Sequence, residues 1–351
     1  MTIKKSKLDK NSSIQKNKLF FSEISAIKGL AIIFVIILHI FAYQGAADIL
    51  QKTYAQFHLW QAISIFMLIL GFTFRIEVEK GYSIGRIISN RLHRILIPLV
   101  FAYLISILIL KIFHVKLQFD WHVFIGYLPI HGMGVYFITL YLETILFFSI
   151  LYIFLKRYNI YFNIIFFLLL TMLIEYLGYY IDIKDAYLYH SSVHRFIPLI
   201  VIGYYFYDEI NGRTQYILYI MGFASMLLLA LYIYNGSVHF TPFNQIRSGS
   251  QSYPYEYYTF LFVVMLFKLF SIVKDYKFFK YLTFIGDGSM HIFLVQIFLF
   301  YIFIKNKIDM NIIYGFLAVF LSIAIGLIWY KLESYLLNKS RIVTPETKPN
   351  S

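Results

Sequence analysis

Long apolar runs separated by short polar segments recur along the whole chain. A helix needs about 20 predominantly apolar residues to cross the hydrocarbon core of a bilayer. Runs this apolar favour helices, because backbone groups in lipid must be hydrogen-bonded within their own segment. The runs that fit this template are residues 27–43, 57–74, 95–113, 135–155, 160–180, 196–207, 216–234, 257–273, 290–304 and 312–329. The pattern predicts an all-α, polytopic membrane helix bundle with about ten transmembrane helices.

Lysine and arginine are divided unequally between alternate loops. Cytoplasmic loops of membrane proteins carry the excess of these residues. With the N-terminus on the cytoplasmic side, 21 of them fall in inner segments, 8 in outer segments and two inside helices. We therefore expect both termini to be cytoplasmic. The predicted domains are a basic tail at residues 1–18, a membrane domain at 19–333 and a second tail at 334–351.

The composition agrees with a chain solvated by lipid. Hydrophobic residues make up 60% of it and charged residues only 14%, a balance that a soluble domain of this length could not bury. The net charge of +13 arises at the ends of apolar runs, so we expect no nucleic-acid partner. The chain has no cysteine, and His58, His131, His194 and His291 show no metal-ligand spacing, so we predict no metal site.

Two ionisable residues lie in the first apolar run, where charge is costly and usually faces a bundle interior. Lys28 and His39 are eleven residues apart, about three helical turns or roughly 16 Å, so they should project from similar faces. Lys28 could be a lysine that reaches the membrane interface, and His39 could be a helix-packing hydrogen-bonder. Histidine titrates near neutrality, however, which also makes His39 a candidate base for a hydroxyl nucleophile.

A second basic group opens the third predicted helix. Arg91 and Arg94 are three residues apart, so they share a helix face and could hold phosphates together, or else anchor the helix at the cytoplasmic interface. With Arg75, Arg86 and Lys28 they would make the inner mouth of the bundle attractive to a polyanion such as coenzyme A.

Two acidic residues lie within predicted helices. Glu143 belongs to the fourth predicted helix and Glu175 to the fifth. Either could pair with a buried base, and Glu143 could instead orient His39. Outer-loop aromatic residues such as Trp121 and Tyr253 are candidates to stack on sugar rings.

Several segments together resemble the acyltransferase 3 family of membrane acyltransferases. The first helix matches its signature of a basic residue, ten residues and a histidine, with Lys28 where arginine is usual. Further matches lie at residues 66–72, 91–98, 196–204 and 284–296. Leu70 stands where a serine is typical, and Gln296 where many members have histidine. The resemblance spans about residues 22–331.

The resemblance implies transfer of an acyl group, usually acetyl, from cytoplasmic acyl-CoA to a hydroxyl of a surface or capsular polysaccharide or its precursor. It carries His39 over as the catalytic histidine, and Lys28, Arg91 and Arg94 as residues on the side of the donor, acetyl-CoA or another acyl-CoA. The expected partners are this donor, a glycan or lipid-linked sugar acceptor, membrane lipid and glycan-synthesis proteins. Richness in Ile, Lys, Asn, Phe and Tyr is typical of AT-rich bacterial genomes, which suggests a bacterial cytoplasmic membrane.

Two other classes of function fit the same pattern. A glycan exporter or flippase also combines many helices with a few buried charges, although no nucleotide-hydrolysis motif is visible to power it. An inactive scaffold in a glycan-synthesis complex is compatible with the residues at Lys28 and Gln296.

Overall fold

The computed structural model describes residues 3–43, 55–116, 125–130, 134–181, 192–235, 255–308 and 311–343, and these ranges contain helices and no strand. The helices of the first half are α1 (Ile3–Tyr43), α3 (Gln56–Leu59), α4 (Ala62–Glu79), α5 (Ile84–Ile112), α6 (Tyr136–Arg157) and α7 (Ile160–Ile181). Those of the second half are η2 (Val193–Arg195), α9 (Ile197–Ile210), α10 (Tyr216–Asn235), η3 (Tyr255–Tyr257), α11 (Tyr258–Val273), α12 (Lys277–Asp287), α13 (Ser289–Lys305) and α14 (Ile312–Val343). The predicted all-α class is confirmed.

Each predicted apolar run contains a helix, but the helices differ in length. Within the described ranges, seven are long and apolar enough to cross a membrane. The pair α12 and α13, bent by 72° at Gly288, forms an eighth if it counts as one span. Helices α9 and α11 are shorter, with 14 and 16 residues, so ten crossings remains a prediction. Helix α12 was not predicted, because its amphipathic sequence falls outside the apolar runs.

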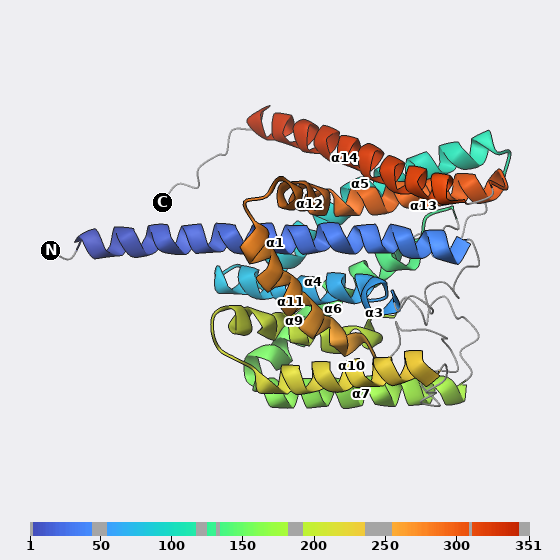
Figure 1. Cartoon of the computed structure of the whole chain (residues 1–351). Coiled ribbons are helices and arrows are strands. Elements are labelled where there is room, and N and C mark those ends of the chain that lie inside the picture. Colours follow the sequence, from blue (N-terminus) through green and yellow to red (C-terminus); the bar gives the residue numbers. More distant parts are fainter. Residues whose placement is uncertain are drawn as a thin grey trace.

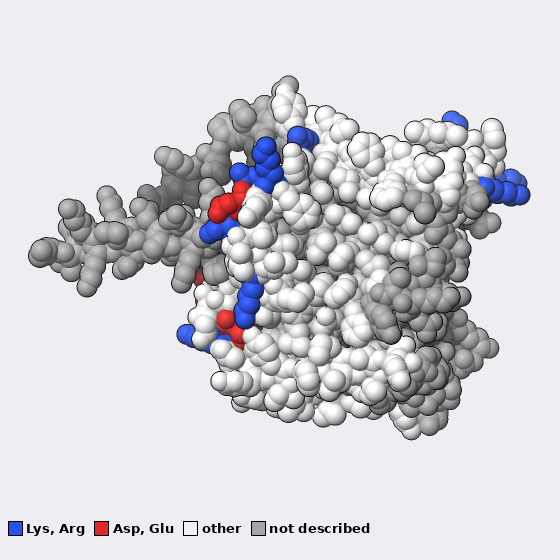
Figure 2. Space-filling model, viewed as in Figure 1, with Lys and Arg blue, Asp and Glu red and all other residues white. Residues whose placement is uncertain are grey.

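The two ends of the described chain lie on the same side of the bundle. Most helices run roughly along one direction, and α1 begins on the side where α14 ends (Figure 1). We call this end of the bundle the inner end, and many of the visible lysines and arginines gather there (Figure 2). The tail boundaries predicted at residues 18 and 334 fall inside α1 and α14, which continue as helices through both positions.

The bundle presents apolar side chains on its outside. On α5, Val100, Leu104 and Leu108 are each more than half exposed and follow one another at four-residue spacing. Such a stripe would be unstable in water, but lipid solvates it. The chain is therefore a multi-pass membrane protein.

Glycines bring two pairs of helices into close contact. A Cβ on Gly29 of α1 would overlap the carbonyl oxygen of Leu282 on α12, and a Cβ on Gly286 would overlap that of Ser25. Gly71 of α4 and Gly203 of α9 make an equivalent reciprocal crossing. Small residues allow helix backbones to approach closely in membranes, where packing stabilises association. The first crossing fixes the position of Lys28 and the second that of α4.

Candidate active site

His39 lies on α1 and is held by a residue from the other end of the chain. Its Nδ1 donates a hydrogen bond of 2.8 Å to Oε1 of Gln296 on α13, whose side chain is fully buried. Phe300, one turn further along α13, packs edge-on against the imidazole with 5.9 Å between ring centroids. With the proton on Nδ1, the other ring nitrogen, Nε2, keeps a lone pair. This is the form that a general base or a nucleophile requires.

A small cavity adjoins this imidazole. It has a volume of about 10 Å³ and is lined by Val35, His39, Ile63, Phe66, Gly134, Tyr136, Phe137 and Phe293. Gly134 has a φ of +88°, which favours glycine, and a Cβ there would lie 2.9 Å from Cε1 and 3.4 Å from Nε2 of His39. The edge of the ring that carries Nε2 therefore faces the backbone of Gly134.

A large cavity of about 1160 Å³ opens at the inner end of the bundle. Its charged and histidine lining consists of Lys28, Arg86, His93, Arg94, Asp287, His291 and Glu333. Residues near the inner ends of α5 and α14, including Tyr82 and Leu337, form its rim. The cavity thus combines two arginines and a lysine with two carboxylates and exceeds the usual size of a pocket for one small ligand.

The two cavities share one wall of phenylalanines. Phe66 of α4, Phe137 of α6 and Phe293 of α13 line both of them. The ring centroids of Phe66 and Phe137 are 5.6 Å apart, and those of Phe137 and Phe293 are 5.1 Å apart. We call these three residues the phenylalanine wall. They lie between the basic residues of the large cavity and His39.

The crossing of α1 and α12 brings Lys28 beside Asp287. Each is next in sequence to a glycine of that crossing, Gly29 or Gly286. The carboxylate of Asp287 is the attractive charge acting on Lys28, and it accepts a 2.7 Å hydrogen bond from the hydroxyl of Ser25. Lys28 lines the large cavity, so of the two alternatives left open by the sequence its side chain faces the interior.

The two arginines that were expected to act together are separated by the structure. Arg94 lines the large cavity, whereas Arg91 is buried against α4. There Arg91 donates to Glu77 at 3.0 Å and to Thr73 at 2.9 Å, and its guanidinium lies over the ring of Phe74. The sequence spacing places both on one side of α5 but does not reveal the partners on the neighbouring helix.

Arg75, also predicted on the donor side, has its own partners outside the large cavity. Its guanidinium donates to the hydroxyl of Tyr204 at 2.6 Å and forms an ion pair with Glu79 at 2.8 Å. It also lies over the ring of Tyr204, on the side of α4 that packs against α9. Of the two arginines expected beside Lys28, Arg91 and Arg94 at the inner mouth, Arg86 lines the large cavity and Arg75 does not.

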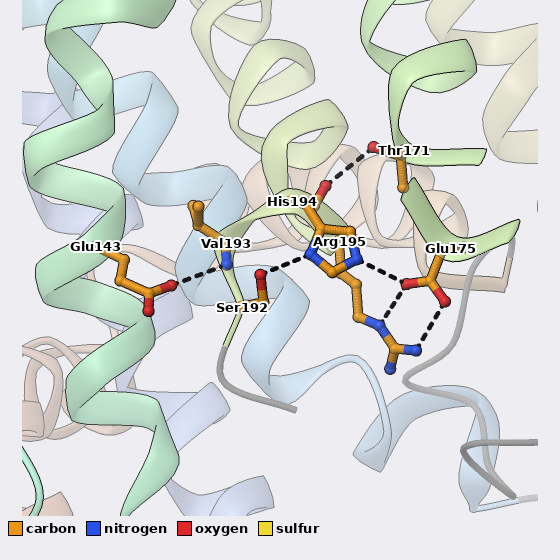
Figure 3. Close-up of polar contacts among 7 residues, drawn as sticks. All are labelled: Glu143, Thr171, Glu175, Ser192, Val193, His194 and Arg195. Carbon is orange, nitrogen blue, oxygen red and sulfur yellow. Dashed lines mark hydrogen bonds and ion pairs between the residues drawn. The ribbon is translucent and has the colours of Figure 1, made fainter. Parts of the chain in front are cut away.

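The two acidic residues make polar contacts with the segment at Ser192–Arg195 (Figure 3). Glu143 accepts a 3.0 Å hydrogen bond from the backbone N–H of Val193, whereas the hydrogen bond of His39 Nδ1 goes to Gln296, so a role of Glu143 in orienting His39 stays a prediction. Glu175 binds Arg195 through two hydrogen bonds of 2.5 and 2.8 Å, which confirms the alternative of a buried base as its partner. Arg195, counted as an outer-loop residue in the sequence, is only 1% exposed.

His291 is a further histidine of the large cavity. It is buried, and its Nε2 pairs with Glu333 of α14 at 3.1 Å. Within the described residues, no three His, Cys, Asp or Glu side chains are grouped closely enough to hold a metal ion. The outer-loop candidates Trp121 and Tyr253 and the histidine His131 lie outside the described residues.

Comparison with known proteins gives the family. A family model described as an acyltransferase domain, of the acyltransferase 3 type, matches residues 21–331, which is most of the chain. No curated protein and no solved structure matches. The matched range includes His39, Gln296, the phenylalanine wall and the basic residues of the large cavity. The chain therefore belongs to the acyltransferase 3 family and is a multi-pass membrane acyltransferase.

Proposed function

We propose that this enzyme transfers an acyl group, expected to be acetyl, from cytoplasmic acyl-CoA to a hydroxyl of a cell-surface or capsular polysaccharide or its precursor. It would act in a bacterial cytoplasmic membrane. One observation carries the proposal: a large cavity with basic residues at the inner end meets, across the phenylalanine wall, a histidine whose Nδ1 donates to Gln296 and whose Nε2 therefore keeps its lone pair.

The donor would bind in the large cavity. Lys28, Arg86 and Arg94 supply positive charge for the phosphates of coenzyme A, and arginine can bind a phosphate through two parallel hydrogen bonds. The flexible pantetheine arm would extend from these cations toward the phenylalanine wall. In this arrangement the thioester reaches His39 from the inner end, while the sugar hydroxyl arrives from the opposite end.

The acyl step needs a base for the alcohol and alignment of two substrates. Nε2 of His39 would remove the proton of the sugar hydroxyl as its oxygen attacks the thioester carbonyl carbon. The tetrahedral intermediate then collapses, the carbon–sulfur bond breaks, and coenzyme A leaves as a thiolate that takes the proton from the imidazolium.

A covalent relay is the alternative chemical route. Nε2 would attack the thioester carbon itself and expel the thiolate, and the sugar hydroxyl would then take the acyl group from the imidazole. Labelled acyl-CoA without an acceptor separates the two routes. The relay leaves labelled protein that His39→Gln lacks, whereas general-base catalysis leaves none.

The central experiment follows label from acyl-CoA to glycan. Membranes that contain the wild-type protein should pass labelled acetyl to glycan and release free coenzyme A. His39→Gln should lower this transfer by at least about 100-fold at equal protein level, because loss of general acid–base catalysis alone costs 10²- to 10⁴-fold. His58→Gln is the matched control, since His58 packs on Phe262 and lines neither cavity.

Two results would contradict the proposal. Undiminished acyl transfer by His39→Gln would show that His39 takes no part in the reaction. A wild-type protein that changes glycan export but releases no coenzyme A would identify an exporter. Mass analysis of surface glycans from cells with and without the protein identifies the acceptor and the acyl group.

A further inference from the structure

The small cavity beside His39 is far smaller than the large cavity. Its volume of about 10 Å³ is close to the minimum that holds one water molecule, roughly 10–15 Å³ by the same kind of measure. Its walls come from α1, α4, α6 and α13 and from Gly134, and they include the buried apolar side chains of Val35, Ile63, Phe137 and Phe293. Such a space suits one small apolar group and no more.

The geometry of a thioester determines which group enters this space. The sulfur must point back to the large cavity, where the coenzyme A cations lie, and the carbonyl carbon must lie within reach of Nε2 of His39 or of a hydroxyl that Nε2 deprotonates. The rest of the acyl group then projects beyond the carbonyl, away from the sulfur. On that side lie Val35, Ile63 and Gly134.

We propose that the small cavity is the acyl pocket, that Val35, Ile63 and Gly134 limit the donor to acyl groups of about the size of acetyl, and that the pantetheine arm passes along the phenylalanine wall. This inference rests on the proposed function and adds the chain length of the donor. The methyl of an acetyl group is about as large as a water molecule, whereas the chains of butyryl and hexanoyl groups would collide with Val35 and Ile63.

The test measures transfer from acetyl-, butyryl- and hexanoyl-CoA by one preparation of each variant. The ratio of kcat/KM values between donors does not depend on the amount of folded protein. In an apolar pocket one methylene changes kcat/KM by roughly 10- to 200-fold. The wild type should therefore prefer acetyl over butyryl by at least about 10-fold. Ile63→Ala should reduce that preference by about 10-fold, because it opens the far wall.

Ile69→Ala is the matched control. Ile69 is on the same helix and as buried as Ile63, at 4% against 7% exposure, but it lines neither cavity. It should leave the donor ratio unchanged. Gly134→Ala works in the opposite direction, because its Cβ would lie 2.9 Å from His39 and fill the pocket. It should lower acetyl transfer. Gly126→Ala controls for backbone strain, because Gly126 also has a positive φ, +98°, but its Cβ would meet Leu142 and Ile138 and not His39.

The outcomes separate this inference from the proposed function. A wild-type enzyme that uses hexanoyl-CoA as well as acetyl-CoA would overturn the acyl pocket while leaving acyl-CoA as the donor. An unchanged donor ratio in Ile63→Ala would also overturn it. A wild type that transfers no acyl group from any coenzyme A thioester would overturn the proposed function itself.

Discussion

Gln296 Oε1 accepts a 2.8 Å hydrogen bond from Nδ1 of His39, across 257 residues of sequence. This contact joins the first membrane helix to α13 inside the bundle. Glutamine cannot transfer protons, but it can fix the tautomer and the orientation of the imidazole. We therefore regard Gln296 as a positioning residue that acts through His39.

The first prediction concerns this hydrogen bond. Gln296→Leu keeps the size of the side chain but removes the acceptor, so kcat should fall by about 10- to 100-fold, the usual cost of losing such a supporting partner. KM for the donor should stay within about twofold, because Gln296 does not line the large cavity. Gln296→Glu keeps an acceptor oxygen and should recover most of the lost kcat. Steady-state kinetics with labelled donor gives both parameters.

Gln61→Leu controls for the loss of any buried amide. Gln61 is also buried within a membrane span, and it accepts a hydrogen bond from Thr259 and lines neither cavity. Its kcat per folded protein should equal that of the wild type. If Gln296→Leu has the same kcat as Gln61→Leu, the positioning role is refuted.

The second prediction separates Arg94 from Arg91. Arg94→Ala removes a cation from the large cavity and should raise KM for acyl-CoA by roughly 10-fold, as expected for loss of a hydrogen bond to a charged group. Arg91→Ala leaves Glu77 without its partner and should lower the free energy of unfolding by about 1–3 kcal/mol. Donor binding and thermal unfolding in detergent, measured on both variants, test the difference. If Arg91→Ala raised the KM for acyl-CoA and Arg94→Ala lowered the stability instead, the roles assigned to these arginines would be wrong.

The third prediction concerns the crossing of α1 and α12. Gly286→Ala places a Cβ against the backbone of Ser25, which no side-chain movement can relieve. It should lower thermal stability and weaken donor binding, because the helices that hold Lys28 and Asp287 must separate. Gly85→Ala, whose Cβ would meet nothing within 4 Å, should change neither property. Equal stability of the two variants would show that the close approach does not hold Lys28 in place.

The fourth prediction compares the two acidic residues of Figure 3. Glu175→Gln leaves the buried guanidinium of Arg195 without its carboxylate, and breaking such a pair typically costs about 3–5 kcal/mol. Glu143→Gln keeps an oxygen that can still accept from Val193 N–H, so its melting temperature should stay near that of the wild type. Thermal unfolding of both variants provides the comparison. If Glu143→Gln folded normally but lost acyl transfer, Glu143 would be needed for catalysis after all.

The sequence by itself determined the all-α class, because apolar runs of membrane length leave the backbone no partners except within a helix. It also identified Lys28 and His39 as candidate functional residues, because ionisable residues in such runs are rare and usually face the bundle interior. It could not find α12, whose residues have the composition of a surface segment, nor see that Arg195 is buried in an ion pair.

Only the tertiary structure decided which residues meet. Arg91 and Arg94 have the same sequence pattern, yet one is enclosed by Thr73 and Glu77 and the other faces a cavity. Gln296 and not Glu143 accepts the hydrogen bond of His39 Nδ1 because contact across a bundle depends on how helices cross, here at glycines that allow close approach. Helical periodicity fixes the face of a residue on its own helix, but the neighbouring helix determines what that face contacts.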